Sequence, residues 1–140
     1  MLKGINKIIS PDLLRILAKM GHGDEIVLSD GNFPGESIGR IVLRSDGTGV
    51  PELLSAILEL FPLDEYDNNV YLMDKTEKDR DLKVGIWDEY RKIVKGHTDR
   101  EPVFLERFEF YERAKKAYAV VVTGESAIYA NVILKKGVVK

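Results

Sequence analysis

Cysteine is absent from this chain of 140 residues, and histidine occurs only twice. The lack of cysteine excludes disulfides, thiol nucleophiles and cysteine metal sites. No apolar run approaches the roughly 18 residues of a membrane-spanning helix, and the first residues contain too few apolar side chains for a signal peptide. Neither sign of charge dominates, because 21 basic and 23 acidic residues leave a formal net charge of -2. We therefore expect no nucleic-acid partner and no membrane surface.

The composition does supply enough apolar material for one core, since 44% of the residues are hydrophobic. At this length we expect a single domain that spans residues 1–140. The plain interpretation is a cytoplasmic protein with a small-molecule partner.

Helical and strand patterns alternate along the chain. Ser10-Pro11-Asp12 opens the first helix, because serine caps the first N–H groups, proline suits the first turn and aspartate complements the helix dipole. Gly21 is expected to end this helix as a C′ glycine. Further helices are expected over Pro51 to Phe61, over Leu82 to Val94, and through Tyr111, Ala114 and Ala117. Strands are expected over Glu25 to Ser29, Ile38 to Leu43, Val70 to Met73, Val103 to Phe108, Ala119 to Thr123 and Val132 to Leu134. This alternation predicts an α/β layered fold, with helices packed on a mainly parallel central sheet.

His22 lies between Gly21 and Gly23, just before the predicted strand that starts at Glu25. Histidine can give and take a proton near neutral pH, which suits general acid–base chemistry. The alternative is a loop histidine that caps the C-terminus of the preceding helix. His97 follows a predicted helix in a polar stretch, and we expect it to be a surface or loop residue.

Asp30 leaves the opposite end of the same strand, where open α/β sheets usually hold their ligands. Its carboxylate could accept hydrogen bonds from sugar hydroxyls, or it could open an Asx-turn at Gly31-Asn32. Phe33-Pro34 then fixes a rigid turn, and the Phe33 ring could face the apolar side of a sugar.

Two later stretches supply polar groups that suit a neutral polyol. Arg107 is expected at the end of a strand, where its guanidinium would donate several N–H bonds in fixed geometry. Ion pairing with Glu106 or Glu109 is the alternative. Tyr129 and Asn131 would point the same way from an extended segment, so that a phenol and an amide could bind adjacent hydroxyls. The alternative there is a hairpin-like turn with a packed tyrosine.

Several separate motifs follow one another in the chain, namely Met20 to Ile26, Ser29 to Pro34, Arg107 to Ala114, and Thr123 to Gly137. Together they resemble the fucose mutarotase and ribose pyranase (RbsD/FucU) family, whose members interconvert ring or anomeric forms of free sugars. The likeness covers nearly the whole chain and is weakest between Asp64 and Pro102. The arginine-containing motif is more similar to the fucose branch than to the ribose branch.

This resemblance implies an RbsD-like fold and L-fucose mutarotase activity, with a monosaccharide as substrate and neither a cofactor nor a metal. It implies that His22 is the proton donor. The residues implied to hold the sugar are Asp30, Arg107, Tyr129, Ala130 and Asn131. It also implies a ring-like homo-oligomer, commonly a decamer.

The chemistry of mutarotation requires a site that can both donate and accept a proton. The ring oxygen must gain a proton while the anomeric hydroxyl loses one, and closure on the other face of the aldehyde reverses the pair. General acid–base catalysis is typically worth about 10²–10⁴-fold, which is enough for a reaction that already proceeds slowly in water. The sequence leaves open whether a water or Tyr129 removes the anomeric proton.

The spacing of His22 and Asp30 has a geometric consequence. Eight positions separate them, and at about 3.3 Å per strand residue a straight run would hold them roughly 20–26 Å apart. One monosaccharide cannot touch both ends of such a run. Either the flanking loops curl back, or the pocket combines His22 from one subunit with Asp30 from its neighbour, and we favour an active site near a subunit interface.

Three alternatives to a fucose mutarotase remain. A D-ribose pyranase would interconvert pyranose and furanose rings. A non-catalytic sugar-binding or regulatory protein would use the same pocket without accelerating anomer exchange. A metal-dependent sugar isomerase would need several clustered His, Asp or Glu ligands, which two histidines in unlike contexts do not favour.

Overall fold

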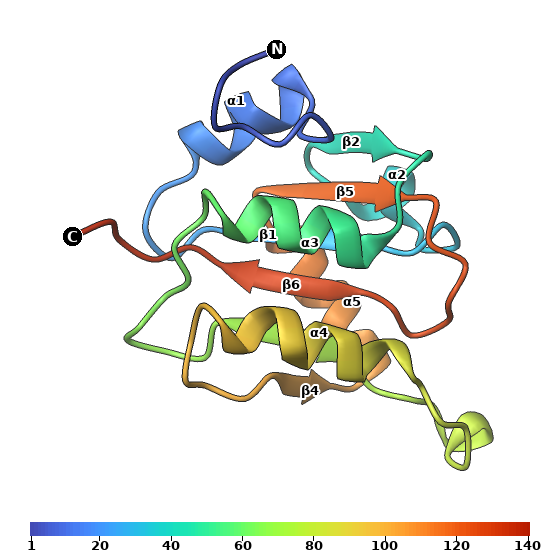
Figure 1. Ribbon diagram of the computed structural model, residues 1–140. Helices are drawn as coiled ribbons and strands as arrows, with labels where there is room; N and C mark the ends of the chain where they lie inside the picture. The colour runs from blue at the N-terminus through green and yellow to red at the C-terminus, as the bar shows by residue number, and fades with distance from the viewer.

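A mixed sheet of six strands forms the centre of the computed structural model, which describes all 140 residues (Figure 1). The strands are β1 (Glu25–Ser29), β2 (Val42–Ser45), β3 (Val70–Met73), β4 (Val103–Leu105), β5 (Ala119–Thr123) and β6 (Val132–Lys135). They lie in the order β2-β5-β1-β6-β3-β4, and β6 alone runs antiparallel to its neighbours. The predicted α/β fold with a mainly parallel sheet is confirmed.

Helices cover both faces of this sheet. Helices α1 (Pro11–Lys19), α3 (Val50–Leu58) and α4 (Ile86–Lys95) pack on one face, and α2 (Gly35–Ile38) and α5 (Arg107–Lys116) pack on the other (Figure 1). Successive strand side chains point to opposite faces, so Ile26 and Leu28 join the core under α3 while Val27 joins the core under α5. No helix combines the length and the apolar content that crossing a membrane requires.

Helix α1 starts as predicted and ends differently. The Ser10 hydroxyl accepts the Leu13 N–H at 3.1 Å, which is the expected N-cap. At the other end, the left-handed glycine is Gly23 (φ 86°) and not Gly21, so the predicted C′ glycine is wrong. The last carbonyl groups of the helix are capped instead by the Lys136 ammonium, which donates to the carbonyl oxygens of residues 17 and 20.

The strand predicted over Ile38 to Leu43 is present as β2 but begins later, because Ile38 ends the short helix α2 and pairing with β5 starts only at Val42. The absence of a side chain at Gly35 allows this helical turn to lie directly on the sheet. A Cβ at Gly35 would be 2.5 Å from a methyl group of Val122. Ile38 therefore packs on the core from a helical turn, whereas Val42 and Leu43 pack from strand β2.

Two boundaries near the site also differ from the prediction. The helix expected from Leu82 starts at Ile86, because the Lys75 ammonium binds the carbonyl oxygen of Leu82 at 2.9 Å and holds that segment in a loop. The strand expected over Val103 to Phe108 stops at Leu105. There the Glu106 side chain accepts the N–H groups of residues 108 and 109 and caps helix α5.

The loop from Thr123 to Asn131 joins two strands that are not neighbours. Strand β1 lies between β5 and β6, so the alternative of a hairpin-like turn is wrong. The loop is fixed at its start by Gly124, whose N–H donates to the Thr48 carbonyl oxygen at 3.0 Å. A Cβ at Gly124 would lie 1.9 Å from the carbonyl oxygen of Asp46.

We expect Gly124→Ala to lower the free energy of unfolding by about 1–3 kcal/mol, because the added methyl group meets backbone that no rotamer change can move. The matched control is Gly47→Ala in the facing turn, where a Cβ would meet nothing within 4 Å. Urea unfolding of both variants measures the difference. Equal stability of the two variants would contradict the close approach.

Candidate functional site

A hollow of about 340 Å³ opens at the edge of the sheet where β1, β3 and β5 end. That volume suits a small ligand, and the carboxyl edge of an open sheet is the usual place for one. Its lining includes Asp30, Phe33, Asp79, Arg107, Tyr129 and Asn131. Four of the predicted sugar-binding side chains therefore converge, although they come from three separate segments.

Asp30 and Asn131 form the floor of the hollow and hold each other in place. The Asp30 N–H donates to Asn131 Oδ1 at 2.9 Å, and both residues are buried. Asp30 Oδ1 also accepts the Asn32 N–H at 2.9 Å, so Asp30 does open an Asx-turn. Burial raises the pKa of the Asp30 carboxyl, although the N–H groups of Asn32, Phe33 and Ala130 favour its ionised form. The fold thus holds a carboxyl group at the base of the hollow, where burying its charged form costs free energy.

Two side chains of α4 hold the backbone of Tyr129 and Ala130. The Trp87 indole N–H donates to the Tyr129 carbonyl oxygen at 2.9 Å, and the Tyr90 hydroxyl donates to the Ala130 carbonyl oxygen at 2.7 Å. Tyr129 has φ 57°, the only positive φ outside glycine, so the expected extended segment is wrong. Such conformations persist where surrounding structure enforces them, and they cluster at functional sites. Ala130 is fully buried and can contribute only its backbone.

The phenol of Tyr129 reaches the arm that follows β3, which we define as residues Lys75–Asp81. Tyr129 Oη donates to Asp79 Oδ2 at 2.5 Å and lies 3.1 Å from Thr76 Oγ1. The sequence showed this stretch only as a run of charged residues. No periodicity or spacing linked it to a tyrosine about fifty positions later, so Thr76 and Asp79 were missed as residues of the hollow.

Arg107 begins α5 and points its side chain toward the same hollow. It pairs with neither neighbouring glutamate, so the ion-pair alternative is wrong. Its Nε is buried without a hydrogen-bond partner, and its guanidinium lies 4.5 Å from the centre of the Phe108 ring. A buried donor without an acceptor is costly, which favours a ligand oxygen as its partner. Arg113, by contrast, is fully engaged with Glu25 at 2.7–2.8 Å.

His22 lies at the opposite edge of the sheet, before β1 begins. Its ring Nε2 is 3.1 Å from Asp64 Oδ1, with the histidine side chain 47% exposed and the aspartate side chain 5% exposed. Burial of Asp64 opposes ionisation, but hydrogen bonds from the Tyr66 N–H and the His22 ring outweigh it and lower the pKa of the carboxyl. The exposed His97 lies in a turn, as expected. Asp64 had no signal in the sequence, because contact with His22 arises only in the folded chain.

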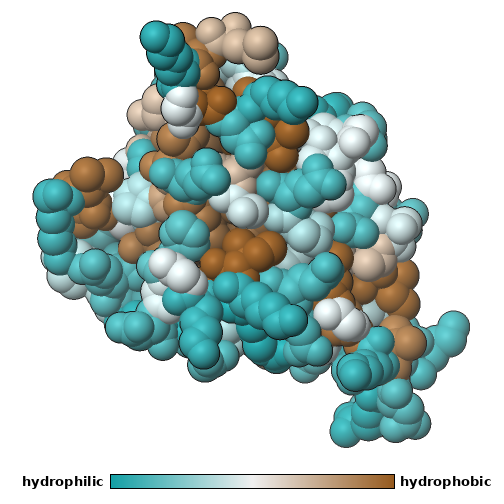
Figure 2. Space-filling view, in the orientation of Figure 1, coloured by the Kyte–Doolittle hydropathy of each residue, from teal (hydrophilic) through white to brown (hydrophobic).

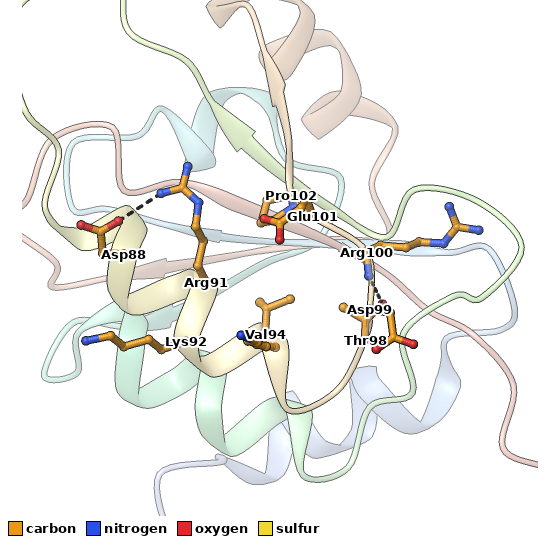
Figure 3. Close-up of a pocket in the computed structure, with 10 residues that line it drawn as sticks. Asp88, Arg91, Lys92, Val94, Thr98, Asp99, Arg100, Glu101 and Pro102 are labelled. Atoms are coloured by element: carbon orange, nitrogen blue, oxygen red, sulfur yellow. Dashed lines mark hydrogen bonds and ion pairs between the residues drawn. The ribbon is translucent and has the colours of Figure 1, made fainter.

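A second hollow, of about 530 Å³, lies between α4 and the loop that follows it (Figure 3). Arg91 on its rim pairs with Asp88 at 3.2 Å, and the side chain of Arg100 points away from the opening. None of the predicted site residues lines it. The hollow around Asp30 is therefore the candidate site. Nowhere in the structure do three His, Asp or Glu side chains gather in a way that could hold a metal ion.

Comparisons with known proteins agree along the whole chain. The RbsD / FucU transport protein family matches residues 3–139. The chain is 54% identical to the fucose mutarotase of Danio rerio, over 99% of this chain and 94% of that protein. The solved fucose mutarotase of Streptococcus pneumoniae, in complex with L-fucose, matches with a TM-score of 0.93 and 50% identity, over 99% of this chain and 100% of that one. RbsD of Bacillus subtilis, complexed with D-ribose, matches with a TM-score of 0.77 and 25% identity, over 100% of both chains.

The lowered pKa of Asp64 predicts a pH-dependent stability. Its ionised form contributes stability fully above the unfolded pKa of about 3.9, and this contribution is lost as the pH falls through the lower folded pKa. We expect Asp64→Asn to lower the free energy of unfolding by about 1 kcal/mol at pH 7, where a bond to a charged acceptor becomes a neutral one. Urea unfolding at pH 7 and pH 3 measures it, with the exposed Asp99→Asn as control. A difference that grows toward pH 3 would contradict the assignment.

Proposed function

The chain belongs to the RbsD/FucU family, and from that membership we propose that it is an L-fucose mutarotase, an isomerase that interconverts the α and β anomers of the free sugar. The observation that carries this conclusion is the likeness along the whole chain, at 50% identity, to a fucose mutarotase solved with L-fucose bound. The likeness to the RbsD that was solved with D-ribose is weaker, at 25% identity.

The hollow around Asp30 supplies what a neutral polyol requires. A sugar has no net charge, so its binding depends on directional donors and acceptors around its hydroxyls. Arg107 offers N–H donors, of which Nε has no protein partner, and the Asp30 carboxylate offers acceptors. Tyr129 and Asn131 add a phenol and an amide, and the backbone of Ala130 supports them. We assign sugar binding to these five residues.

We assign the proton donor to His22, with Asp64 as the group that orients it. The bond between His22 Nε2 and Asp64 occupies one ring nitrogen, which leaves Nδ1 free to face a substrate. A carboxylate in this place fixes the orientation of the histidine ring. The half-exposed ring is accessible to a partner molecule.

These two sets of residues cannot meet within one subunit. His22 precedes β1 and Asp30 follows it, and His22 is absent from the lining of the hollow. We therefore propose that each active site joins the hollow of one subunit to the His22 edge of the next. Two unlike surfaces that pair head to tail generate a closed ring when the rotation between successive subunits closes, which is the case we propose. A decamer, the size that the family resemblance implies, is the assembly we propose.

Apolar side chains at both edges support this arrangement. Tyr66 lies beside the His22 ring, at 5.6 Å between centroids, and is 68% exposed. Phe108 and Ile128 stand at the other edge and are 59% and 49% exposed. Exposed large apolar groups next to polar functional groups are typical of surfaces that bind another protein.

The reaction follows from this pairing. His22 of the neighbouring subunit gives a proton to the ring oxygen as the bond between that oxygen and the anomeric carbon breaks. The anomeric hydroxyl loses its proton to an acceptor in the hollow, and the open aldehyde forms. Rotation about the bond between the first two carbons presents the other face, and closure returns both protons.

Magnetisation transfer between the α and β anomers of L-fucose tests the function directly. We expect the protein to accelerate exchange and His22→Ala to reduce that acceleration by about 10²-fold or more, because the general acid is lost. His97→Ala is the matched control and should retain the parent rate. A His22→Ala variant as active as the parent would refute the role of the histidine.

The same experiment separates the other functions. D-ribose measured beside L-fucose is expected to exchange more slowly, and faster pyranose–furanose exchange of ribose would favour a ribose pyranase. A protein that gains thermal stability from fucose without accelerating exchange would be a binding protein and not an enzyme. The cytoplasmic location stays a prediction.

Mixing two inactive variants tests the shared site. His22→Ala and Arg107→Ala each remove one half of it. If a site takes one half from each of two neighbours, random one-to-one mixed rings restore about a quarter of the sites, because each half is intact with a chance of about one half. Unfolding the two variants together and refolding them provides the mixed rings. Each variant refolded alone is the control, and a mixture with no activity would contradict a site shared between subunits.

A further inference from the structure

The loop Asp64–Asn69 joins α3 to β3 and lies beside the His22 ring, and we call it the aspartate loop. Asp64 Oδ1 lies 3.1 Å from His22 Nε2 and accepts the Tyr66 N–H at 3.2 Å. Residues 65–68 are exposed, and hydrophilic residues cover this part of the surface (Figures 1 and 2). Apolar packing therefore contributes little to the position of the loop, which depends on hydrogen bonds.

Asn69 closes the aspartate loop at its base. The Asp64 N–H donates to the Lys135 carbonyl oxygen at 3.0 Å, and the Lys135 N–H donates to the Asn69 carbonyl oxygen at 2.9 Å. Both ends of the loop thus bind one residue of β6. Asn69 itself is only 2% exposed, and its Nδ2 donates to the Asp64 carbonyl oxygen at 2.8 Å. The side chain of Asn69 therefore fixes the peptide group of the residue that binds His22.

The turn that follows α4 holds the same loop at two points. The second hydrogen of Asn69 Nδ2 donates to Thr98 Oγ1 at 2.9 Å, which one amide group can do at the same time as its first bond. Thr98 Oγ1 also accepts the Arg100 N–H at 3.2 Å (Figure 3). The Arg100 guanidinium in turn donates to the Glu65 carbonyl oxygen at 2.9 Å. Thr98 and Arg100 therefore join this turn to the aspartate loop.

The Asn69 amide makes its bonds from one side only. Its Oδ1 atom is buried without a hydrogen-bond partner, and a buried acceptor without a donor costs free energy. Both bonds of its Nδ2 join segments around Asp64. What the amide contributes thus lies on its donor side, where it holds the Asp64 main chain.

We propose, as a step that rests on the mutarotase function, that Asn69 is a positioning residue for the proton donor His22 and that Thr98 supports it. By fixing the carbonyl group of Asp64, Asn69 fixes the direction of the carboxylate, which in turn orients the His22 ring. Proton transfer depends on such orientation, because a displacement of about 1 Å can cost about 100-fold in rate. In the shared site proposed above, the sugar is held by the hollow of the neighbouring subunit, so Asn69 acts on kcat and not on affinity.

Asn69→Leu tests this role, because leucine has nearly the size of asparagine but donates no hydrogen bond from its side chain. We expect kcat for fucose anomer exchange to fall by about 10-fold, with KM close to that of the parent, since the ring loses its orientation while the hollow is unchanged. Asn68→Leu is the matched control: it removes the same amide from the next residue, which is exposed, and should retain the parent kcat. Sedimentation ensures that the proteins are compared at equal assembly.

Thr98 supplies a second pair of variants. Thr98→Val removes one acceptor of the Asn69 amide and the acceptor of the Arg100 N–H, and it should lower kcat by a smaller factor. Thr98→Ser keeps the hydroxyl group and should restore kcat. This pair decides the question if Asn69→Leu does not fold.

Two readouts separate positioning from a merely structural role. In an Asp64→Asn background, Asn69→Leu should lower kcat by less than about 2-fold, because the carboxylate through which it acts is already lost. The Tyr66 N–H donates to the same carboxylate, so its hydrogen exchange should be faster in Asn69→Leu and unchanged in Asn68→Leu.

An Asn69→Leu variant with the parent kcat overturns the positioning role, and so does an equal loss in Asn68→Leu. Effects of Asn69→Leu and Asp64→Asn that simply multiply overturn it as well, because the two residues would then act independently. If Asn69→Leu does not fold, a Thr98→Val variant with the parent kcat overturns the role. A parent protein that does not accelerate anomer exchange overturns the mutarotase function and the role in catalysis with it, while exchange of the Tyr66 N–H still shows whether Asn69 holds the carboxylate.

Discussion

Strand β1 is the constraint that holds His22 and Asp30 apart. Four of its five residues are buried, and it is tied to both β5 and β6 by backbone hydrogen bonds, so it cannot shorten or bend to bring its ends together. It therefore keeps the pair of His22 and Asp64 at one edge of the sheet and the hollow around Asp30 at the other. In the arrangement that we propose, neither edge catalyses mutarotation alone. The proposed assembly into a ring would convert two incomplete edges into complete sites.

Local signals in the sequence predicted the elements whose causes are local. The cap at Ser10 and the buried strand from Glu25 to Ser29 were predictable, because capping chemistry and apolar runs act over a few residues. The predictions failed where a distant group decides the outcome. Helix α1 ends at the ammonium of Lys136, and the strand expected at Ile38 is a helical turn because Gly35 packs on Val122. Strand order was beyond sequence reasoning for the same reason.

The residues of the candidate site likewise divide into those that the sequence could indicate and those that it could not. His22 and Asp30 could be proposed because they flank a strand that the sequence predicts from its apolar run, and the family resemblance added Arg107 and Tyr129. Asp64 could not be found, since a buried carboxylate 42 positions from its histidine leaves no local pattern. The site also holds several costly features at once, including a carboxyl whose pKa burial raises, an arginine Nε without a partner and a tyrosine with positive φ. A rigid sheet and the side chains of α4 maintain them, which is typical of a site whose ligand completes its hydrogen bonds.

The most direct test of the central claim is the rate of fucose anomer exchange per subunit, measured across a dilution series in which sedimentation reports the fraction of assembled rings. If each site needs the His22 edge of one subunit and the Asp30 edge of another, the rate per subunit falls in proportion to the assembled fraction and vanishes for monomers. Monomers that retain the full rate per subunit would contradict the claim.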